Sequence, residues 1–146
     1  MVLSGEGSDE LFGGYNIYRE PGMLKLVDWL PERFRKWLAK RAGSLPRQMK
    51  GRGYLMRAAL PLNERYIGNA YIFHEEEKMR LLKRKVTKPA KEFLSGTYDE
   101  VGHLSAPEQM QSVDLQYWLP GDILQKADRM SMAHSLELRV PFLDWD

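Results

Sequence analysis

A glycine-rich loop near the start of the chain carries two carboxylates that could act on a phosphate. Residues 4–10 read SGEGSDE and directly follow the apolar residues 1–3. A strand that ends in such a turn before a helix presents free backbone N–H groups to an anion. Glu6 lies inside the turn and Asp9 at the helix start, so a divalent cation could bridge their carboxylates and a phosphate. A plain turn fits equally, because Ser8 suits a helix N-cap and a first turn favours acids.

The loop differs from two common phosphate-binding motifs. Gly5 and Gly7 supply the first two glycines of a dinucleotide fingerprint, but Glu10 occupies the position of the third. No Gly-Lys-Ser/Thr sequence follows, so the loop is not a Walker motif either. A phosphate site here would therefore belong to another class.

A second candidate site lies near the other end of the chain, within residues 118–132. Asp122 and Lys126 stand four residues apart, which places them on one face of a predicted helix. A lone lysine on an apolar helix could neutralise a phosphoryl or pyrophosphate group. The spacing also fits a surface ion pair that contributes only about 0.3–0.5 kcal/mol. Spacing alone does not choose between the two interpretations.

Charge is distributed unevenly along the chain. Residues 31–91 carry 17 of the 22 Lys and Arg but only 5 of the 20 acids, although the whole chain has a net charge of +2. A basic segment of this kind can bind nucleic acid or another acidic partner. It can equally be a solvated helix face whose cations neutralise the acidic ends of the chain within the fold.

Composition excludes several other classes of protein. The chain has 146 residues, enough for one domain, and no cysteine, which excludes a disulfide framework, a thiolate zinc site and a cysteine nucleophile. Its three histidines lie before an acidic run, in a loop and on the last predicted helix, and we expect no zinc site at them. No apolar run reaches the roughly 18–20 residues that span a bilayer, and no signal peptide is recognisable. We therefore expect a cytoplasmic protein without a membrane partner.

The elements that must position these residues are predicted to be helical almost throughout, because apolar residues recur at spacings of three and four. Only residues 1–3 are predicted as a strand and residues 20–22 as a helix break. Residues 83–104 are predicted to be loop-rich, with a short helix around residues 91–94, and the tail, residues 139–144, to be extended or irregular. The remaining helices are expected to start at Ser8 and at positions 23, 31, 46, 61, 74, 106 and 120, with a break between residues 119 and 120.

Two stretches together resemble the family of glutamine-hydrolysing asparagine synthetases. They are residues 4–15, SGEGSDELFGGY, and residues 118–144, which contain WLPGDIL and RVPFLD. The resemblance implies a mainly α fold: the helical, C-terminal portion of an α/β adenine-nucleotide α-hydrolase-like (ATP pyrophosphatase) synthetase domain, with a vestige of its parallel sheet. Residues 1–146 would form a partial domain, because the family's Ser-Gly-Gly-x-Asp-Ser pyrophosphate loop and its glutaminase domain are absent from this sequence.

The resemblance also implies an activity. In the family, ATP and Mg²⁺ convert aspartate to β-aspartyl-AMP, and ammonia derived from glutamine then displaces AMP to give asparagine. Carried over to this sequence, the family's site residues fall into four groups. They are the catalytic Glu6 and Lys126, Ser4 and Gly5 at ATP, Asp9 at the metal, and Asp122 and Arg139 in support.

This chain alone is expected to be inactive, because it lacks the pyrophosphate loop. Two other functions remain alternatives: a related adenylating synthetase that forms an amide or β-lactam, and a basic helical module that binds nucleic acid or an acidic partner. Helices that packed on a missing sheet would expose apolar surface, so we also expect a homo-oligomer.

Overall fold

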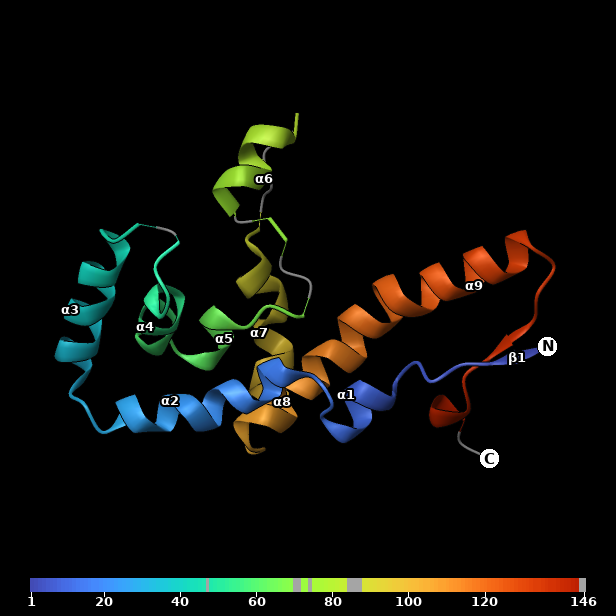
Figure 1. Ribbon diagram of the computed structural model, residues 1–146, viewed down its shortest axis with the longest axis horizontal. Helices are drawn as coiled ribbons and strands as arrows, with labels where there is room; N and C mark the ends of the chain where they lie inside the picture. The colour runs from blue at the N-terminus through green and yellow to red at the C-terminus, as the bar shows by residue number, and fades with distance from the viewer. Residues whose placement is uncertain (47, 70–71, 74, 84–87, 145–146) are drawn as a thin grey trace.

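Helices occupy most of the chain, as the sequence predicts. The computed structural model describes residues 1–46, 48–69, 72–73, 75–83 and 88–144, in an elongated arrangement with both ends of the chain near β1 (Figure 1). Its elements in chain order are β1 (Val2–Leu3), α1 (Ser8–Phe12), the 3-10 helix η1 (Asn16–Arg19), α2 (Glu20–Asp28), α3 (Glu32–Gly43), α4 (Arg52–Ala58), α5 (Leu62–Arg65), α6 (Glu75–Leu81), α7 (Ala90–Glu100), α8 (Ala106–Val113), the π-helix η2 (Asp114–Leu124), α9 (Gln125–Ala133), β2 (Leu138–Arg139) and the 3-10 helix η3 (Pro141–Leu143).

The two ends of the chain form a short parallel sheet. Val2 pairs with Leu138 and Leu3 with Arg139, so β2 is a strand that the sequence indicates only as extended tail. The Val2 N–H donates to the Glu137 carbonyl at 2.8 Å. A parallel pair needs a long crossover connection, and here the helices from α1 to α9 lie between the two strands.

The core lies where η1, α7 and α8 meet. Its fully buried cluster consists of Tyr18, Tyr66, Leu94, Tyr98, Met110 and Val113. The sequence-based expectation that residues 83–104 are loop-rich is wrong for their described C-terminal part, because α7 is an 11-residue helix. Leu94 and Tyr98 stand four residues apart and both face the core, so burial stabilises a segment whose polar residues suggest a loop.

A buried carboxylate ties this core together. Asp114 is fully buried and accepts hydrogen bonds from the Tyr18 hydroxyl at 2.6 Å, from the Tyr66 hydroxyl and from the Asn69 N–H at 3.0 Å. Burial raises the pKa of Asp114, and these three donors act in the opposite direction. Burial followed by the hydrogen bond to Asp114 raises the pKa values of Tyr18 and Tyr66. The tyrosines therefore stay neutral donors.

Two prolines behave differently from the sequence-based expectation. Residues 20–22 do not break a helix but begin α2, because a first helical turn tolerates the missing N–H of Pro21. Pro120 does not separate two helices either: α8, η2 and α9 run on as one long helix (Figure 1). In a π-helix each N–H bonds five residues back, which relieves the contact between a proline ring and the carbonyl four residues back.

Apolar side chains are exposed at the end of the molecule that carries the sheet. Phe12 is 75% exposed, and Met130, Met132 and Phe142 are exposed as well. No helix within the described residues combines the length and the apolar character needed to cross a membrane. Oligomerisation through the apolar surface stays a prediction, which sedimentation velocity can test.

Candidate active site

The glycine-rich loop is held between the sheet and the tail of the chain. Ser4 follows β1, and its N–H donates to the Arg139 carbonyl at 2.9 Å. The Ser4 hydroxyl donates to the Glu6 carboxylate, which orients the acid within the loop. The Ser8 N–H donates to the Gly5 carbonyl at 3.2 Å and closes the turn.

The N-cap of α1 is Gly7, one residue before the predicted Ser8. Gly7 has φ of 89°, in the left-handed region that residues with a Cβ seldom occupy. A Cβ at this position would lie 2.5 Å from Cδ2 of Leu143 in η3. Glycine therefore serves twice here: it permits the turn, and it lets the tail pack against the loop.

A pocket of about 360 Å³ opens at this loop. Four of the predicted site residues line it: Ser4, Gly5, Glu6 and Asp9. The other lining residues are Gly7, Glu10, Tyr15 and Ile123. The structure thus gathers the predicted nucleotide, metal and catalytic residues of the loop around one cavity, beside the π-helix that carries Ile123.

Gly14, two residues after α1, leaves room for the Asp9 carboxylate. A Cβ on Gly14 would lie 2.0 Å from the Asp9 Oδ1, and the Gly14 N–H donates to the Asp9 carbonyl at 2.9 Å. Among the described residues, no group of three or more His, Cys, Asp or Glu could hold a metal ion by itself. One carboxylate suits Mg²⁺ nevertheless, because this ion takes most of its remaining ligands from phosphates and water.

Sequence reasoning missed the part that Glu10 and Tyr15 play in the pocket. It assigned Glu10 to the favourable end of a helix dipole, yet the side chain is 1% exposed and accepts a hydrogen bond from the Tyr15 hydroxyl at 3.0 Å. Gln111 Nε2 donates to the Glu10 carbonyl at 2.7 Å and joins α1 to α8. Burial and the bond to Glu10 raise the pKa of Tyr15 to about 12. An acid in a first turn gives no sequence signal of burial.

The structure does not bring the three remaining predicted residues to the pocket wall. Lys126 is 63% exposed and its Nζ lies 3.1 Å from the Asp122 Oδ2, so the expected i,i+4 pair forms at the surface. Ile123, one turn before Lys126, lines the pocket instead. The guanidinium of Arg139 donates to Glu137 Oε1 through Nε at 2.9 Å, while its carbonyl binds Ser4.

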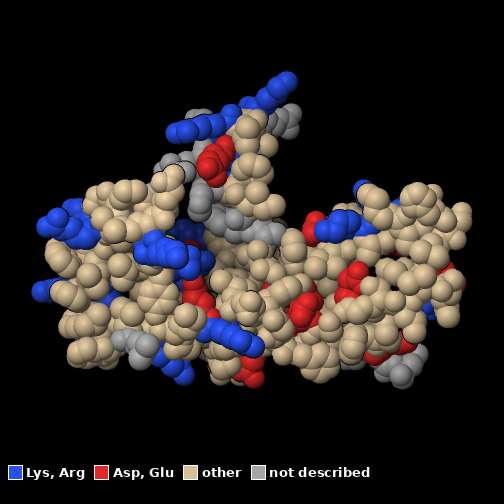
Figure 2. Space-filling view, viewed as in Figure 1, with Lys and Arg blue, Asp and Glu red and all other residues tan. Residues whose placement is uncertain are grey.

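Many cations of the basic segment have partners within the fold. Lys and Arg gather over the α3–α4 end and over α6 in Figure 2. Ion pairs there include Lys36 with Glu32 at 2.5 Å and Lys78 with Glu75 at 2.9 Å. Of the histidines considered as metal ligands, His74 lies outside the described residues. These two ion pairs lie within the basic segment, where 17 cations outnumber 5 acids, so they neutralise only part of its charge.

Known proteins match this chain over nearly its whole length. Residues 1–146 match the family described as asparagine synthase. The chain is 50% identical over 145 residues to asparagine synthetase [glutamine-hydrolyzing] 1 of Bacillus subtilis (strain 168), covering 99% of this chain and 23% of that protein. It is 46% identical over 152 residues to a putative asparagine synthetase [glutamine-hydrolyzing] of Mycobacterium tuberculosis (strain ATCC 25618 / H37Rv), covering 99% of this chain and 22% of that protein. The chain thus spans less than a quarter of these relatives, and no solved structure matches significantly.

Proposed function

The chain belongs to the asparagine synthase family, and from this premise we propose that it is the C-terminal part of the synthetase domain of a glutamine-hydrolysing asparagine synthetase. The family match covers every residue, and relatives named asparagine synthetase match the chain over nearly its whole length. In this proposal the sheet of β1 and β2 is the remnant of the larger parallel sheet of an ATP pyrophosphatase-type fold.

The observation that carries the proposal is the pocket at the glycine-rich loop, which collects Ser4, Gly5, Glu6 and Asp9 in one place. We assign the first two to the nucleotide. The turn between β1 and α1 suits an anion, because the N–H groups of a first helical turn have no partner within the helix. The reaction assigned to the parent protein is adenylation of aspartate by ATP, followed by attack of ammonia.

Glu6 is assigned as the base that takes a proton from the attacking ammonia. Its carboxylate lines the pocket and accepts a hydrogen bond from the Ser4 hydroxyl, which holds it toward the cavity side of the turn. General-base catalysis by a positioned side chain contributes about 10²- to 10⁴-fold to a rate. Ammonia would lose its proton to Glu6 as the C–N bond forms and the bond to AMP breaks.

Asp9 and Lys126 are assigned to the charge of the phosphates. Asp9 would supply the protein ligand of Mg²⁺, which neutralises phosphate charge when bound. Lys126 would leave Asp122 and extend toward the pyrophosphate, since its exposed pair with Asp122 is weak and its stem is flexible. Asp122 would hold Lys126 until the phosphates bind, and Arg139 would hold Ser4 through its backbone.

These 146 residues are proposed to be inactive by themselves, because they contain neither a Ser-Gly-Gly-x-Asp-Ser loop nor a cysteine for glutamine hydrolysis. Aspartate, ATP and glutamine are therefore assigned as substrates of the longer parent protein, which we expect in the cytoplasm. Aspartate-dependent exchange of pyrophosphate into ATP by the isolated chain would contradict this part of the proposal.

A chimera tests the assigned roles directly. This chain replaces the matching segment of the Bacillus subtilis relative, with which it is 50% identical over 145 residues. Glu6→Gln is expected to lower asparagine formation by about 100-fold or more while aspartate-dependent exchange persists, because adenylation precedes the attack of ammonia. Lys25→Ala on the exposed face of α2 is the control. Asparagine formation by the Glu6→Gln chimera at the rate of the unsubstituted chimera would refute the role of Glu6.

A further inference from the structure

A second and larger cavity lies at the other end of the molecule from the sheet, where α3, α4 and α5 come together (Figure 1). Its volume is about 750 Å³, roughly twice that of the loop pocket. Ligand sites in proteins typically occupy about 300–1,000 Å³. The function proposed above makes no use of this cavity.

Cations outnumber carboxylates around the cavity. Its charged lining residues are Lys36, Arg52, Arg57, Arg65 and Glu64. Each nearby carboxylate already holds a cation: Glu32 pairs with Lys36, Glu64 with Lys91 at 3.9 Å, and Glu20 with both Arg57 and Arg65. With Lys91, Glu20 and Glu32, which pair with lining residues but lie outside the lining, five cations stand against three carboxylates, an excess of two positive charges.

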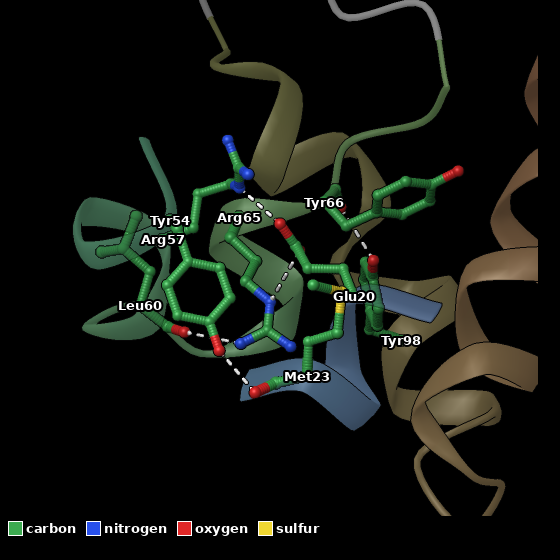
Figure 3. Close-up of polar contacts among 8 residues, drawn as sticks. All are labelled: Glu20, Met23, Tyr54, Arg57, Leu60, Arg65, Tyr66 and Tyr98. Atoms are coloured by element: carbon green, nitrogen blue, oxygen red, sulfur yellow. Dashed lines mark hydrogen bonds and ion pairs between the residues drawn. The ribbon is translucent and has the colours of Figure 1, made fainter. Parts of the chain in front are cut away.

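Glu20 is the centre of this arrangement (Figure 3). It projects from the start of α2 between Arg57 of α4 and Arg65 of α5, whose Nε lies 3.7 Å from Glu20 Oε2. The Tyr54 hydroxyl donates to the Met23 carbonyl and fastens α4 to α2 beside the ion pairs. The two arginines are thus fixed in place before any ligand arrives, which lowers the entropy that binding would lose.

Two arginine N–H groups at the cavity make no hydrogen bond within the described part of the chain, although the Nε of Arg65 lies in a long ion pair, 3.7 Å from Glu20 Oε2. They are the buried Nε groups of Arg52 and Arg65. The Arg65 side chain is only 10% exposed, and it donates to the Leu60 carbonyl at 3.4 Å through Nη1. Arg52 reaches the Gly43 carbonyl at 3.4 Å through Nη2 and has no carboxylate partner among the described residues. Buried donors of this kind normally have a partner, and a bound anion would supply one.

The rest of the wall is apolar. It consists of Ala39, Gly53, Met56, Ala59, Leu60 and Ile67. None of the described lining residues is aromatic, so the cavity offers no stacking platform for a nucleic-acid base. From the excess charge, the unpaired Nε of Arg52 and the apolar wall, we propose that this cavity binds a small organic dianion, with its charged head at Arg52 and Arg57 and an apolar body against Met56 and Leu60.

Hexyl phosphate at pH 8 is a suitable probe, because it joins a dianionic head to an aliphatic body. Isothermal titration of the 146-residue chain is expected to show one site for hexyl phosphate, with a Kd at least 10-fold below that of inorganic phosphate. Arg52→Gln should weaken binding at least 10-fold. Arg33→Gln, which removes the same charge from an exposed position of α3 outside the cavity, should leave the Kd unchanged.

A second variant tests the head of the site without removing a charge. A Cβ on Gly53 would lie 3.1 Å from Nη1 of Arg57, so Gly53→Ala displaces the guanidinium. Alanine favours a helix more than glycine does, so the fold should be retained and the melting temperature kept or raised. Binding of hexyl phosphate should nevertheless weaken several-fold.

Three results would overturn the proposal. Equal affinity for hexyl phosphate and inorganic phosphate would remove the role of the apolar wall. Equal losses in Arg52→Gln and Arg33→Gln would indicate unspecific attraction to the basic surface. Binding of single-stranded RNA with a steep salt dependence, and no binding of hexyl phosphate, would favour a nucleic-acid surface instead.

Discussion

Replacing Gly7 by alanine tests how the sheet, the loop and the tail hold one another. Gly7 has φ of 89°, and a non-glycine residue in the left-handed region costs about 1–2 kcal/mol. The new Cβ would also lie 2.5 Å from Cδ2 and 2.8 Å from Cγ of Leu143. Overpacking of this kind costs about 1–3 kcal/mol. Because Leu143 is only half-buried and can move partly aside, we expect a loss of about 2–4 kcal/mol in the free energy of unfolding.

Urea unfolding followed by circular dichroism measures this loss. A small domain has a slope of about 1–3 kcal/mol per molar urea, so the midpoint should fall by about 1–2 M. A double variant separates the backbone strain from the steric contact. Adding Leu143→Ala to Gly7→Ala removes the contact between the new Cβ and Leu143 but leaves the strain of the positive φ. The loss caused by Gly7→Ala should therefore be smaller by about 1 kcal/mol or more in the Leu143→Ala background.

Gly22→Ala provides the matched control. Gly22 lies within α2, its φ is not positive, and a Cβ there would meet nothing within 4 Å. Alanine should stabilise this helix by about 0.5–1 kcal/mol. If Gly7→Ala unfolds at the same urea concentration as the unsubstituted chain, the described packing of Leu143 on the loop is wrong. If Gly7→Ala destabilises equally with and without Leu143, strain alone accounts for the loss.

Three further substitutions test separate parts of the structure. Glu20→Gln leaves the nearly buried Arg65 without its carboxylate and should lower the free energy of unfolding by about 3 kcal/mol in urea. The raised pKa of Tyr15, about 12, contributes stability that is present below about pH 10 and is lost as pH rises toward 12, so Tyr15→Phe should flatten that fall in alkaline unfolding curves. Lys126→Ala should change stability by less than about 0.5 kcal/mol, because its pair with Asp122 is exposed, yet lower pyrophosphate exchange by the chimera.

One result would contradict each of these three predictions. A Glu20→Gln variant as stable as the unsubstituted chain would mean that Arg65 finds another partner or water. An unchanged alkaline slope in Tyr15→Phe would show that Tyr15 titrates as in water. Full exchange by the Lys126→Ala chimera would remove this lysine from the site and leave the ion pair with Asp122 as its only role.

Local features were predictable from the sequence because the interactions behind them lie close together in the chain. The predominance of helices follows from apolar spacing, and the pair of Asp122 with Lys126 follows from the four-residue separation on one helix face. The predicted loop residues Ser4, Gly5, Glu6 and Asp9 were recognisable by type and order, and they do line one pocket. Their catalytic roles remain predictions.

Long-range contacts determined the rest. Sequence alone did not reveal β2 as a strand, because a two-residue strand depends on pairing with β1 at the far end of the chain. It indicated only a short helix around residues 91–94, whereas α7 spans residues 90–100, because burial of Leu94 and Tyr98 stabilises it against weak local preference. It also did not foresee that the chain continues helically through Pro120.

The candidate site likewise combines local features with features that depend on long-range contacts. The sequence by itself determined which side chains are available: carboxylates at Glu6 and Asp9 in a glycine-rich turn, and a lysine four residues after an acid. Only the tertiary structure decided that Glu10 is buried and bound to Tyr15, and that Lys126 lies outside the pocket wall. The reason is physical: residue type and spacing set the local chemistry, whereas packing between distant segments sets burial, and burial determines which groups face the cavity.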